Sequence, residues 1–461
     1  MRKLLIFCVL SLSAQAQDLD FYAQLAAPMN FGDARFNALA GNTVAMSGSL
    51  SALAINPATA GLYRQDAASI DAGFFNSRNR DSSASSIGNG LNLNVGNLGF
   101  VARNQENGWN WFFCFNSDQI FRERIRHEAE NGGSILSQLI NNAAGTPPDF
   151  LPELGPYEDL MFQSYAVDWN ASTRLYTANA DLTNVNTTHS FTRRGLRDRW
   201  TLGTGKGLTQ RLYIGGSASI IHTFERVDVV HNETFNSSTD LTAFEMEEWW
   251  QNSGIGISAN GGFYYRPVQG LRIAGAIELP HLIAFDQDWE TSFRAVRDSI
   301  SASGITVTGF GQDYTWTMAT APKFRGGATL VAGRLGLITA SYCYTPTSMG
   351  RMLSRNERSI NSAIDSTLSD IHQMGIGGEM RFGTITLRGG WTYITSAQEE
   401  LDDQLQMGLG ASYSSDGFTY YVTYAHLIRT KQYFMYSADF TNAIPYSNSF
   451  SFLNAGVSVK F

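Results

Sequence analysis

The chain has 461 residues, with 44 glycines, 29 phenylalanines and 19 tyrosines against only 11 prolines, a composition that favours strands and tight turns over helices. The net charge of −8 and the absence of a basic run give no indication of nucleic-acid binding. After the first residues, no stretch approaches the roughly 18 consecutive apolar residues of a membrane-spanning helix. A membrane location would therefore require a closed barrel.

The first 16 residues have the features of a secretory signal peptide. Arg2 and Lys3 form a charged start, an apolar core follows, and the small residues Ala14 and Ala16 precede Gln17 at cleavage spacing. We therefore expect residues 1–16 to be removed. The remaining cysteines, Cys114 and Cys343, do not form a disulfide framework.

Residues 17–64 come before the first strand signal and do not show strand alternation. A barrel of about fourteen strands is too wide for its own side chains to fill. We therefore expect this segment to form a plug, or hatch, inside the lumen.

From residue 65 to residue 461, segments of alternating apolar and polar residues recur between short turns. In the segment 270–285, for example, Ile273 and Ile277 share one face, while Arg272 and Glu278 share the other and would point into a lumen. The pattern predicts an all-β fold, an outer-membrane barrel of about 14 antiparallel strands, with short turns near 105, 208, 268, 334, 383 and 416 facing the periplasm. The predicted strands are 67–76, 91–103, 108–121, 198–206, 210–230, 253–266, 270–285, 322–332, 335–346, 373–382, 385–396, 404–414, 418–430 and 450–461.

The largest predicted outer loop, 122–197, is unusually apolar for a loop. Its apolar residues either form a landing groove for a hydrophobic ligand or pack on one another. As a groove, the candidate substrate-binding residues are Leu136, Leu139, Ile140, Leu160, Phe162 and Tyr165.

The chain finishes with an alternating strand, in which Val457, Val459 and the terminal Phe461 share one parity. An aromatic residue at the end of such a strand is typical of bacterial outer-membrane barrels. Together with the signal peptide, it predicts an integral protein of the outer membrane of a Gram-negative bacterium, in contact with outer-membrane lipid.

Within the predicted hatch, the run from Asp33 to Gly41 is followed by Asn56-Pro57-Ala58. With the hydrophobic loop and the terminal Phe461, this resembles the FadL family of outer-membrane transporters for long-chain fatty acids and other hydrophobic compounds. The resemblance implies that an apolar ligand lands among the outer loops, enters a pocket inside the barrel and leaves sideways when the hatch moves. The implied hatch or gating residues are Arg35, Phe36, Asn56, Pro57 and Ala58.

This sequence differs from the family pattern in two respects, which limit what the resemblance implies about the cargo. Relatives more often place glycine directly after the triplet, whereas this chain has Thr59-Ala60-Gly61, and no further signature identifies the cargo. Long-chain fatty acids are the default cargo, and Arg272 or Arg388 could hold a ligand carboxylate by a bidentate contact.

Other functions are less well supported by the sequence. The seven histidines have no metal-ligand spacing and no Gly-x-Ser-x-Gly elbow is present, so we expect no enzyme activity, no cofactor and no metal. The alternative is a FadL-like barrel that acts as a secretion-associated shuttle or scaffold, or as an adhesin, and binds a protein partner through its outer loops.

Overall fold

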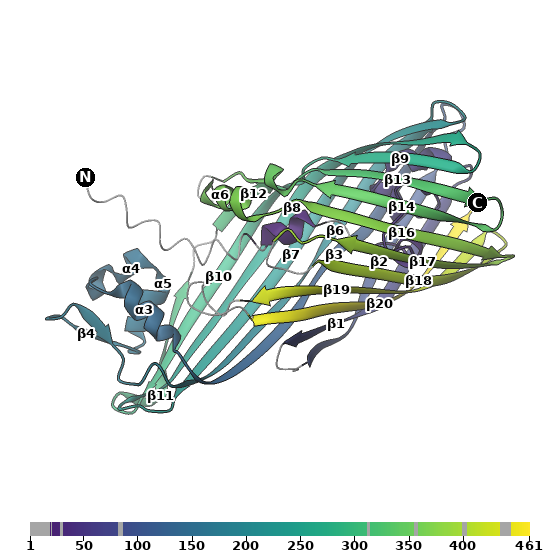
Figure 1. Cartoon of the computed structure of the whole chain (residues 1–461). Helices are drawn as coiled ribbons and strands as arrows, with labels where there is room; N and C mark the ends of the chain where they lie inside the picture. Colours follow the sequence, from purple (N-terminus) through teal and green to yellow (C-terminus); the bar gives the residue numbers. More distant parts are fainter. Residues whose placement is uncertain are drawn as a thin grey trace.

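The computed structural model describes residues 19, 21–27, 31–81, 86–310, 314–354, 358–398, 403–433 and 444–461. The proposed signal peptide, 1–16, lies outside the described residues. The chain forms a closed 14-strand antiparallel barrel (Figure 1). Its wall strands are β1 (Ala67–Asp81), β2 (Ser86–Ala102), β3 (Trp109–Gly132), β6 (Val185–Gly207), β7 (Leu212–Phe235), β8 (Leu241–Val268), β9 (Leu271–Glu278) continued by β10 (Leu282–Arg297), β13 (Lys323–Ala332), β14 (Gly336–Thr345), β16 (Ile371–Phe382), β17 (Ile385–Ile394), β18 (Gln404–Ser415), β19 (Phe418–Tyr433) and β20 (Ile444–Lys460).

The barrel closes because its first strand pairs with its last. The register between β1 and β20 runs without interruption from Ala67 opposite Lys460 to Asp81 opposite Tyr446. Each other strand pairs with its neighbours in chain order. Both β11 (Ser301–Phe310) and β12 (Tyr314–Ala319) pair with β10 and extend the wall next to it. Among the described residues, no helix is long and apolar enough to cross a membrane.

The two faces of the wall differ in chemistry. On neighbouring strands β13 and β14, Leu330 and Ile338 point outward and are 62% and 58% exposed, whereas Thr329 and Thr339 point inward and are fully buried. The two threonine hydroxyls bond to each other at 2.8 Å. A continuous apolar exterior over a polar interior is what a lipid-facing barrel requires.

The predicted short turns are confirmed, because each falls between two consecutive wall strands. That they face the periplasm stays a prediction. Two expectations were wrong in their bounds. The predicted strand 270–285 is divided at residues 279–281, because Pro280 lacks an N–H to donate to a ladder. The predicted loop 122–197 is shorter, since β3 continues to Gly132 and β6 begins at Val185.

The remaining outer loop carries a small subdomain at the far end of the long strands (Figure 1). Its core packs against β7, β8 and β10 through Phe235, Phe244 and Phe293. A second outer segment contributes the two-residue strand β15, which pairs with β12. The elements of the subdomain are α3 (Ile135–Ala143), η3 (Pro148–Phe150), α4 (Leu151–Leu154), α5 (Pro156–Gln163), β4 (Asp168–Asn170) and β5 (Leu175–Thr177), and those of the second segment are η4 (Thr347–Met349), β15 (Arg351–Met352) and α6 (Arg358–Thr367).

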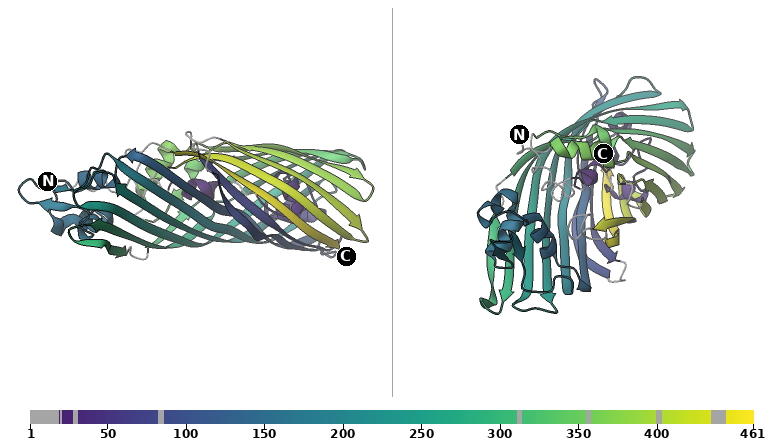
Figure 2. Two further views of the ribbon diagram at one scale, coloured as in Figure 1. Left: turned by 90° about the horizontal axis from the view of Figure 1, so that it is seen from below. Right: turned by 60° about the vertical axis from the view of Figure 1, so that its left-hand side comes forward.

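The N-terminal segment lies inside the barrel as predicted for a hatch (Figure 2). Residues 21–26 are helical and are followed by α2 (Ala34–Ala38), η1 (Ser51–Ala54) and η2 (Pro57–Leu62). The η2 helix packs against β6, β7 and β8. This close approach requires glycine in the wall, since a Cβ at Gly215 would lie 2.5 Å from the Ala58 nitrogen.

We predict that Gly215→Val displaces η2 from the wall without unfolding the barrel. Overpacking of this kind costs roughly 1–3 kcal/mol, so the hatch should be cleaved ~5–150-fold faster by a protease. The matched control is Gly216→Val on the same strand, because a Cβ there meets only the Asn260 oxygen at 3.7 Å. Heat-modifiable mobility in gel electrophoresis shows whether the barrel of each variant is folded. Equal rates of hatch cleavage in the two variants would contradict the prediction.

Candidate functional site

The two halves of the hatch motif are joined through the carboxylate of Asp33. One oxygen accepts the Phe36 N–H at 2.8 Å and caps α2, and the other accepts the Ser49 hydroxyl at 2.7 Å and the Ser51 N–H at 3.0 Å. The Ser51 hydroxyl in turn accepts the Asp33 N–H at 2.7 Å. These contacts make residues 33–51 of the hatch one hydrogen-bonded unit.

Asn56 attaches this unit to the barrel wall. Its side-chain amide donates to the Val44 carbonyl at 3.0 Å and to the Phe263 carbonyl on β8 at 3.2 Å, while its Oδ1 accepts the Ala58 N–H at 3.2 Å. Pro57 occupies the first position of η2, where a missing N–H costs nothing. The triplet is thus a rigid turn bonded both to the hatch and to the wall.

Arg35 makes the second attachment, which we call the latch: Arg35 on the hatch with Glu379 on β16 and Arg388 on β17. Glu379 Oε1 lies 2.5 Å from Arg35 Nε and 2.9 Å from Arg388 Nε. Arg35 Nη1 also donates to the Ser47 carbonyl at 2.6 Å. The sequence predicted that Arg388 could bind the carboxylate of a transported ligand. In the structure Arg388 instead forms an ion pair with the carboxylate of Glu379.

Phe36 and Arg272, the other predicted lumen residues, have different surroundings. Phe36 is buried between the hatch and the wall, where it packs with Val44, Ile55 and Tyr264. Arg272 is half-buried on the inward face of β9, and no ion pair joins it to a carboxylate in the described part of the chain.

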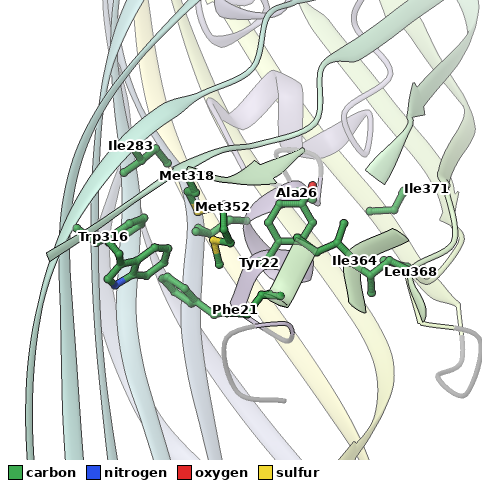
Figure 3. Close-up of a cluster of buried hydrophobic side chains, with 14 of the residues drawn as sticks. Phe21, Tyr22, Ala26, Ile283, Trp316, Met318, Met352, Ile364, Leu368 and Ile371 are labelled. Atoms are coloured by element: carbon green, nitrogen blue, oxygen red, sulfur yellow. The ribbon is translucent and has the colours of Figure 1, made fainter. Parts of the chain in front are cut away.

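A cluster of buried apolar side chains, which we call the apolar chamber, fills the lumen on the outer side of the hatch (Figure 3). Phe21 and Tyr22 of the N-terminal helical residues project into it, and the Phe21 ring lies 5.5 Å from that of Phe285 and 6.1 Å from that of Trp316. Tyr22 donates its hydroxyl to the Thr347 carbonyl at 2.6 Å. The wall of the apolar chamber consists of Phe121, Ile221, Ile283, Phe285, Trp316, Met318, Met352, Ile360, Ile364, Leu368, Ile371, Ile394 and Ala397.

The family resemblance implied a pocket inside the barrel, but sequence reasoning did not identify the residues of the apolar chamber. Its side chains come from β3, β7, β10, β12, β15, α6, β16 and β17, so no local pattern contains more than a few of them. The one available signal was apolar residues at positions where strand parity would place them inward, such as Ile283 and Phe285 on β10.

A buried ion cluster borders this chamber, and it consists of Arg197, Arg199, Lys323, Arg325, Asp118 and Glu278. Arg199 Nη2 lies 2.6 Å from Asp118 and 3.0 Å from Glu278, and Arg325 Nη1 lies 2.5 Å from Glu278. Arg197 Nη1 donates to the Leu25 carbonyl of the N-terminal helical residues at 2.7 Å, which places the cluster against the chamber. Four cations face two carboxylates, so the cluster carries two positive charges in excess.

The barrel wall has an interruption between β2 and β3. Their pairing ends where Asn97 lies opposite Asn116, although β2 continues to pair with β1 as far as Ser86 and β3 with β6 as far as Gly132. A bulge at Asp118 changes the direction of β3 at this point. We call the unpaired stretch between residues 86–96 and 117–132 the lateral gap.

Side chains compensate for the missing ladder bonds at the lateral gap. The carbonyls of Arg122 and Arg124 accept hydrogen bonds from the side chains of Ser77 at 3.1 Å and Asn79 at 2.8 Å, both on β1. On the lumen side, Phe31 of the hatch packs with Ile120, Phe75, Phe450 and Phe452. The gap is thus closed from inside by apolar side chains, one of which belongs to the hatch.

The six loop residues predicted as a landing groove are brought together in the outer subdomain. Leu136, Leu139 and Leu160 are buried in its core, Ile140 and Phe162 are half-buried, and Tyr165 is exposed. The groove stays a prediction, and a ligand would reach the three leucines only if the subdomain opened.

No protein-family model and no curated protein matches this sequence. Solved structures do match in fold: the Pseudomonas putida toluene transporter TodX at 13% identity and a TM-score of 0.57, and the Ralstonia pickettii toluene transporter TbuX at 14% and 0.52. A Pseudomonas aeruginosa FadL homologue matches at 9% identity and a TM-score of 0.54. The matches cover 94% of this chain and 99%, 99% and 100% of the three structures, respectively.

The chain has the FadL-type barrel fold. The fold predicted from the Asn56-Pro57-Ala58 motif, the signal peptide and the strand pattern is therefore confirmed. In the FadL-type fold of this chain, the hatch, the apolar chamber, the buried ion cluster and the lateral gap are contiguous, because Phe121 and Ile120 of β3 face the chamber and the gap, respectively.

We predict that Glu379→Gln opens the latch. The change leaves the Arg35 and Arg388 guanidinium groups without their shared carboxylate, which should weaken the contact of hatch and wall by roughly 3–5 kcal/mol. In planar lipid bilayers, we expect more frequent openings than in the unmodified protein. Asp416→Asn in an exposed periplasmic turn is the control, and an unchanged opening frequency in Glu379→Gln would show that the latch does not hold the hatch.

Proposed function

We propose that this protein transports hydrophobic small molecules across the outer membrane, with long-chain fatty acids as the cargo class and sideways release through the lateral gap. The observation that carries the proposal is an apolar chamber inside a barrel, bordered by buried positive charge and adjacent to an interruption in the wall. A water-filled pore would give an apolar molecule no favourable environment, whereas this chamber does.

The N-terminal helical residues mark where the ligand would bind. Phe21 lies among Phe121, Phe285 and Trp316 at ring distances of 5.5 to 6.3 Å. An acyl chain that entered the chamber would take the place of these side chains and bury a similar apolar surface. Their displacement would also break the hydrogen bond from Arg197 of β6 to the Leu25 carbonyl, which joins these residues to the wall.

The buried ion cluster supports a cargo with an anionic group. Lys323 Nζ is buried and has no hydrogen-bond acceptor in the described part of the chain, and its nearest carboxylate oxygen, on Glu278, is 3.9 Å away. A buried ammonium group without an acceptor is costly. A ligand carboxylate would satisfy Lys323 while its alkyl chain occupied the chamber.

Two structures of similar fold are named for toluene and for monoaromatic hydrocarbons. Such compounds match the apolar character of the chamber, but they carry no negative charge to pair with the buried ion cluster. A neutral aromatic molecule would use the apolar wall and leave Lys323 without an acceptor. Cargo charge therefore separates the two possibilities for this chain. Mass spectrometry of ligands extracted from protein purified out of native outer membrane would identify the retained molecule, and a co-purifying protein without lipid would favour the scaffold or adhesin alternative.

We predict that Lys323→Gln lowers the affinity for palmitate about tenfold, because one charge-assisted hydrogen bond of about 1.4 kcal/mol is lost. The affinities for methyl palmitate and for toluene should not change. Isothermal titration calorimetry of the detergent-solubilised protein measures all three ligands, and Lys206→Gln near the periplasmic end of β6 is the control. Tight toluene binding without palmitate binding would replace fatty acids by neutral aromatics as the cargo.

We also predict that Asn56→Ala and Pro57→Ala lower uptake several-fold while the barrel stays folded. Asn56→Ala removes three hydrogen bonds, each contributing roughly 0.5–1.5 kcal/mol, and Pro57→Ala loosens the turn before η2. Cellular uptake of a radiolabelled fatty acid is the measurement, with Thr209→Ala in an exposed turn as the control. Normal uptake in both variants would remove the hatch triplet from the mechanism.

A further inference from the structure

A cavity lies at the periplasmic end of the lumen, where the hatch meets the wall. It has a volume of about 280 Å³ and is enclosed by hatch residues and by the turn-side ends of β1 and β16 to β20. We call it the mouth pocket. Among the described residues that line it are four cations, Arg35, Arg381, Arg388 and Lys460, and seven hydroxyl-bearing residues, Tyr63, Thr384, Thr386, Ser414, Thr419, Tyr421 and Ser458, but no aspartate or glutamate.

The positive charge of the mouth pocket is only partly neutralised. Glu379 contacts Arg35 and Arg388 through the same oxygen, Oε1. Arg381 and Lys460 are exposed to the pocket opening, and no described carboxylate lies within ion-pair distance of either side chain. Four cations and one shared carboxylate leave three positive charges in excess around a small volume.

An ordinary solvated surface would not have this construction. The side chains of Arg35 and Arg388 are only 11% and 7% exposed, so water screens their charges poorly. Arg388 is also fixed in place, because its Nη1 donates to the Ser412 hydroxyl at 2.7 Å and its guanidinium lies over the Tyr421 ring. Fixed guanidinium groups with free N–H donors, together with hydroxyl groups, are suited to carboxylate and phosphate oxygens.

We propose that the mouth pocket binds a small anion with carboxylate or phosphate chemistry, and that this anion fastens the closed hatch to the wall. The hatch contributes Arg35, whereas Arg388, Arg381 and Lys460 belong to the wall, so an anion between them joins parts that separate when the hatch moves. The pocket has room for a phosphate or a short-chain carboxylate, and its largely cationic and hydroxyl-bearing lining gives a long acyl chain no apolar surface to bury against. It shares no residue with the apolar chamber, and the anion is therefore distinct from the cargo.

An anion that binds only when Arg35 is in place stabilises the closed hatch by mass action. Without it, the excess positive charge on both sides of the contact opposes closure. Free phosphate and the headgroup of an anionic amphiphile share the required chemistry. Because the two sources differ in size and charge, the experiment compares inorganic phosphate with a short-chain carboxylate.

The test uses the full-length protein in neutral detergent, with inorganic phosphate and sodium hexanoate as probes and sodium chloride at matched ionic strength as the reference. We expect phosphate or hexanoate, but not chloride, to slow proteolysis of the hatch. The double variant Arg381→Gln/Lys460→Gln should lower the affinity of the effective probe at least tenfold, whereas Arg211→Gln in an exposed turn should not change it. Calorimetric titration of the same samples gives the affinities.

Protection by phosphate but not by hexanoate would assign the pocket to free phosphate, and the reverse would assign it to carboxylates. Equal protection in the double variant and in the unmodified protein would overturn the proposal, as would the absence of any protection beyond that of chloride. Palmitate binding in the chamber is measured in parallel. Because Lys323→Gln should leave the phosphate or hexanoate effect intact, failure of the anion site and failure of the transport proposal can be told apart.

Discussion

Every backbone N–H and C=O group inside a bilayer must be bonded within the protein, and the structure depends on how this chain meets that constraint. The uninterrupted register between β1 and β20 removes both free edges of the sheet. Closure with fourteen strands leaves a lumen too wide for wall side chains to fill. The hatch fills it, and its packing on the wall explains the inward-facing glycines such as Gly215 and Gly262, whose missing side chains make room for Ala58 and Asn56.

The lateral gap is the local exception to complete pairing. Beyond Asn116, β3 has no ladder bonds to β2, and the bulge at Asp118 coincides with this change. The exposed carbonyls of Arg122 and Arg124 are satisfied by Ser77 and Asn79 instead. At this interruption the wall is held by side-chain contacts in place of ladder bonds, and opening it would break no β2–β3 ladder, as the proposed sideways release requires.

Charge is distributed unevenly along the lumen. The buried ion cluster beside the apolar chamber and the mouth pocket at the periplasmic end both contain more cations than carboxylates, although the whole chain has a net charge of −8. Between them lies the hatch, joined to the wall at Asn56 and at the latch. Anionic groups are thus favoured on both sides of the hatch, and the apolar chamber favours an alkyl chain on the outer side only.

The sequence by itself determined the barrel and the hatch, because a two-residue period and short turns are local properties that any pairing must respect. It also pointed to Arg35, Asn56 and Pro57 as hatch residues, whose gating role stays a prediction. Only the tertiary structure decided the partners of those residues: Arg388 was predicted for a ligand but is paired with Glu379, which lies nine residues away and one strand over. The chamber and the gap were likewise out of reach, since Phe21 and Trp316 become neighbours only after the strands have closed around the hatch.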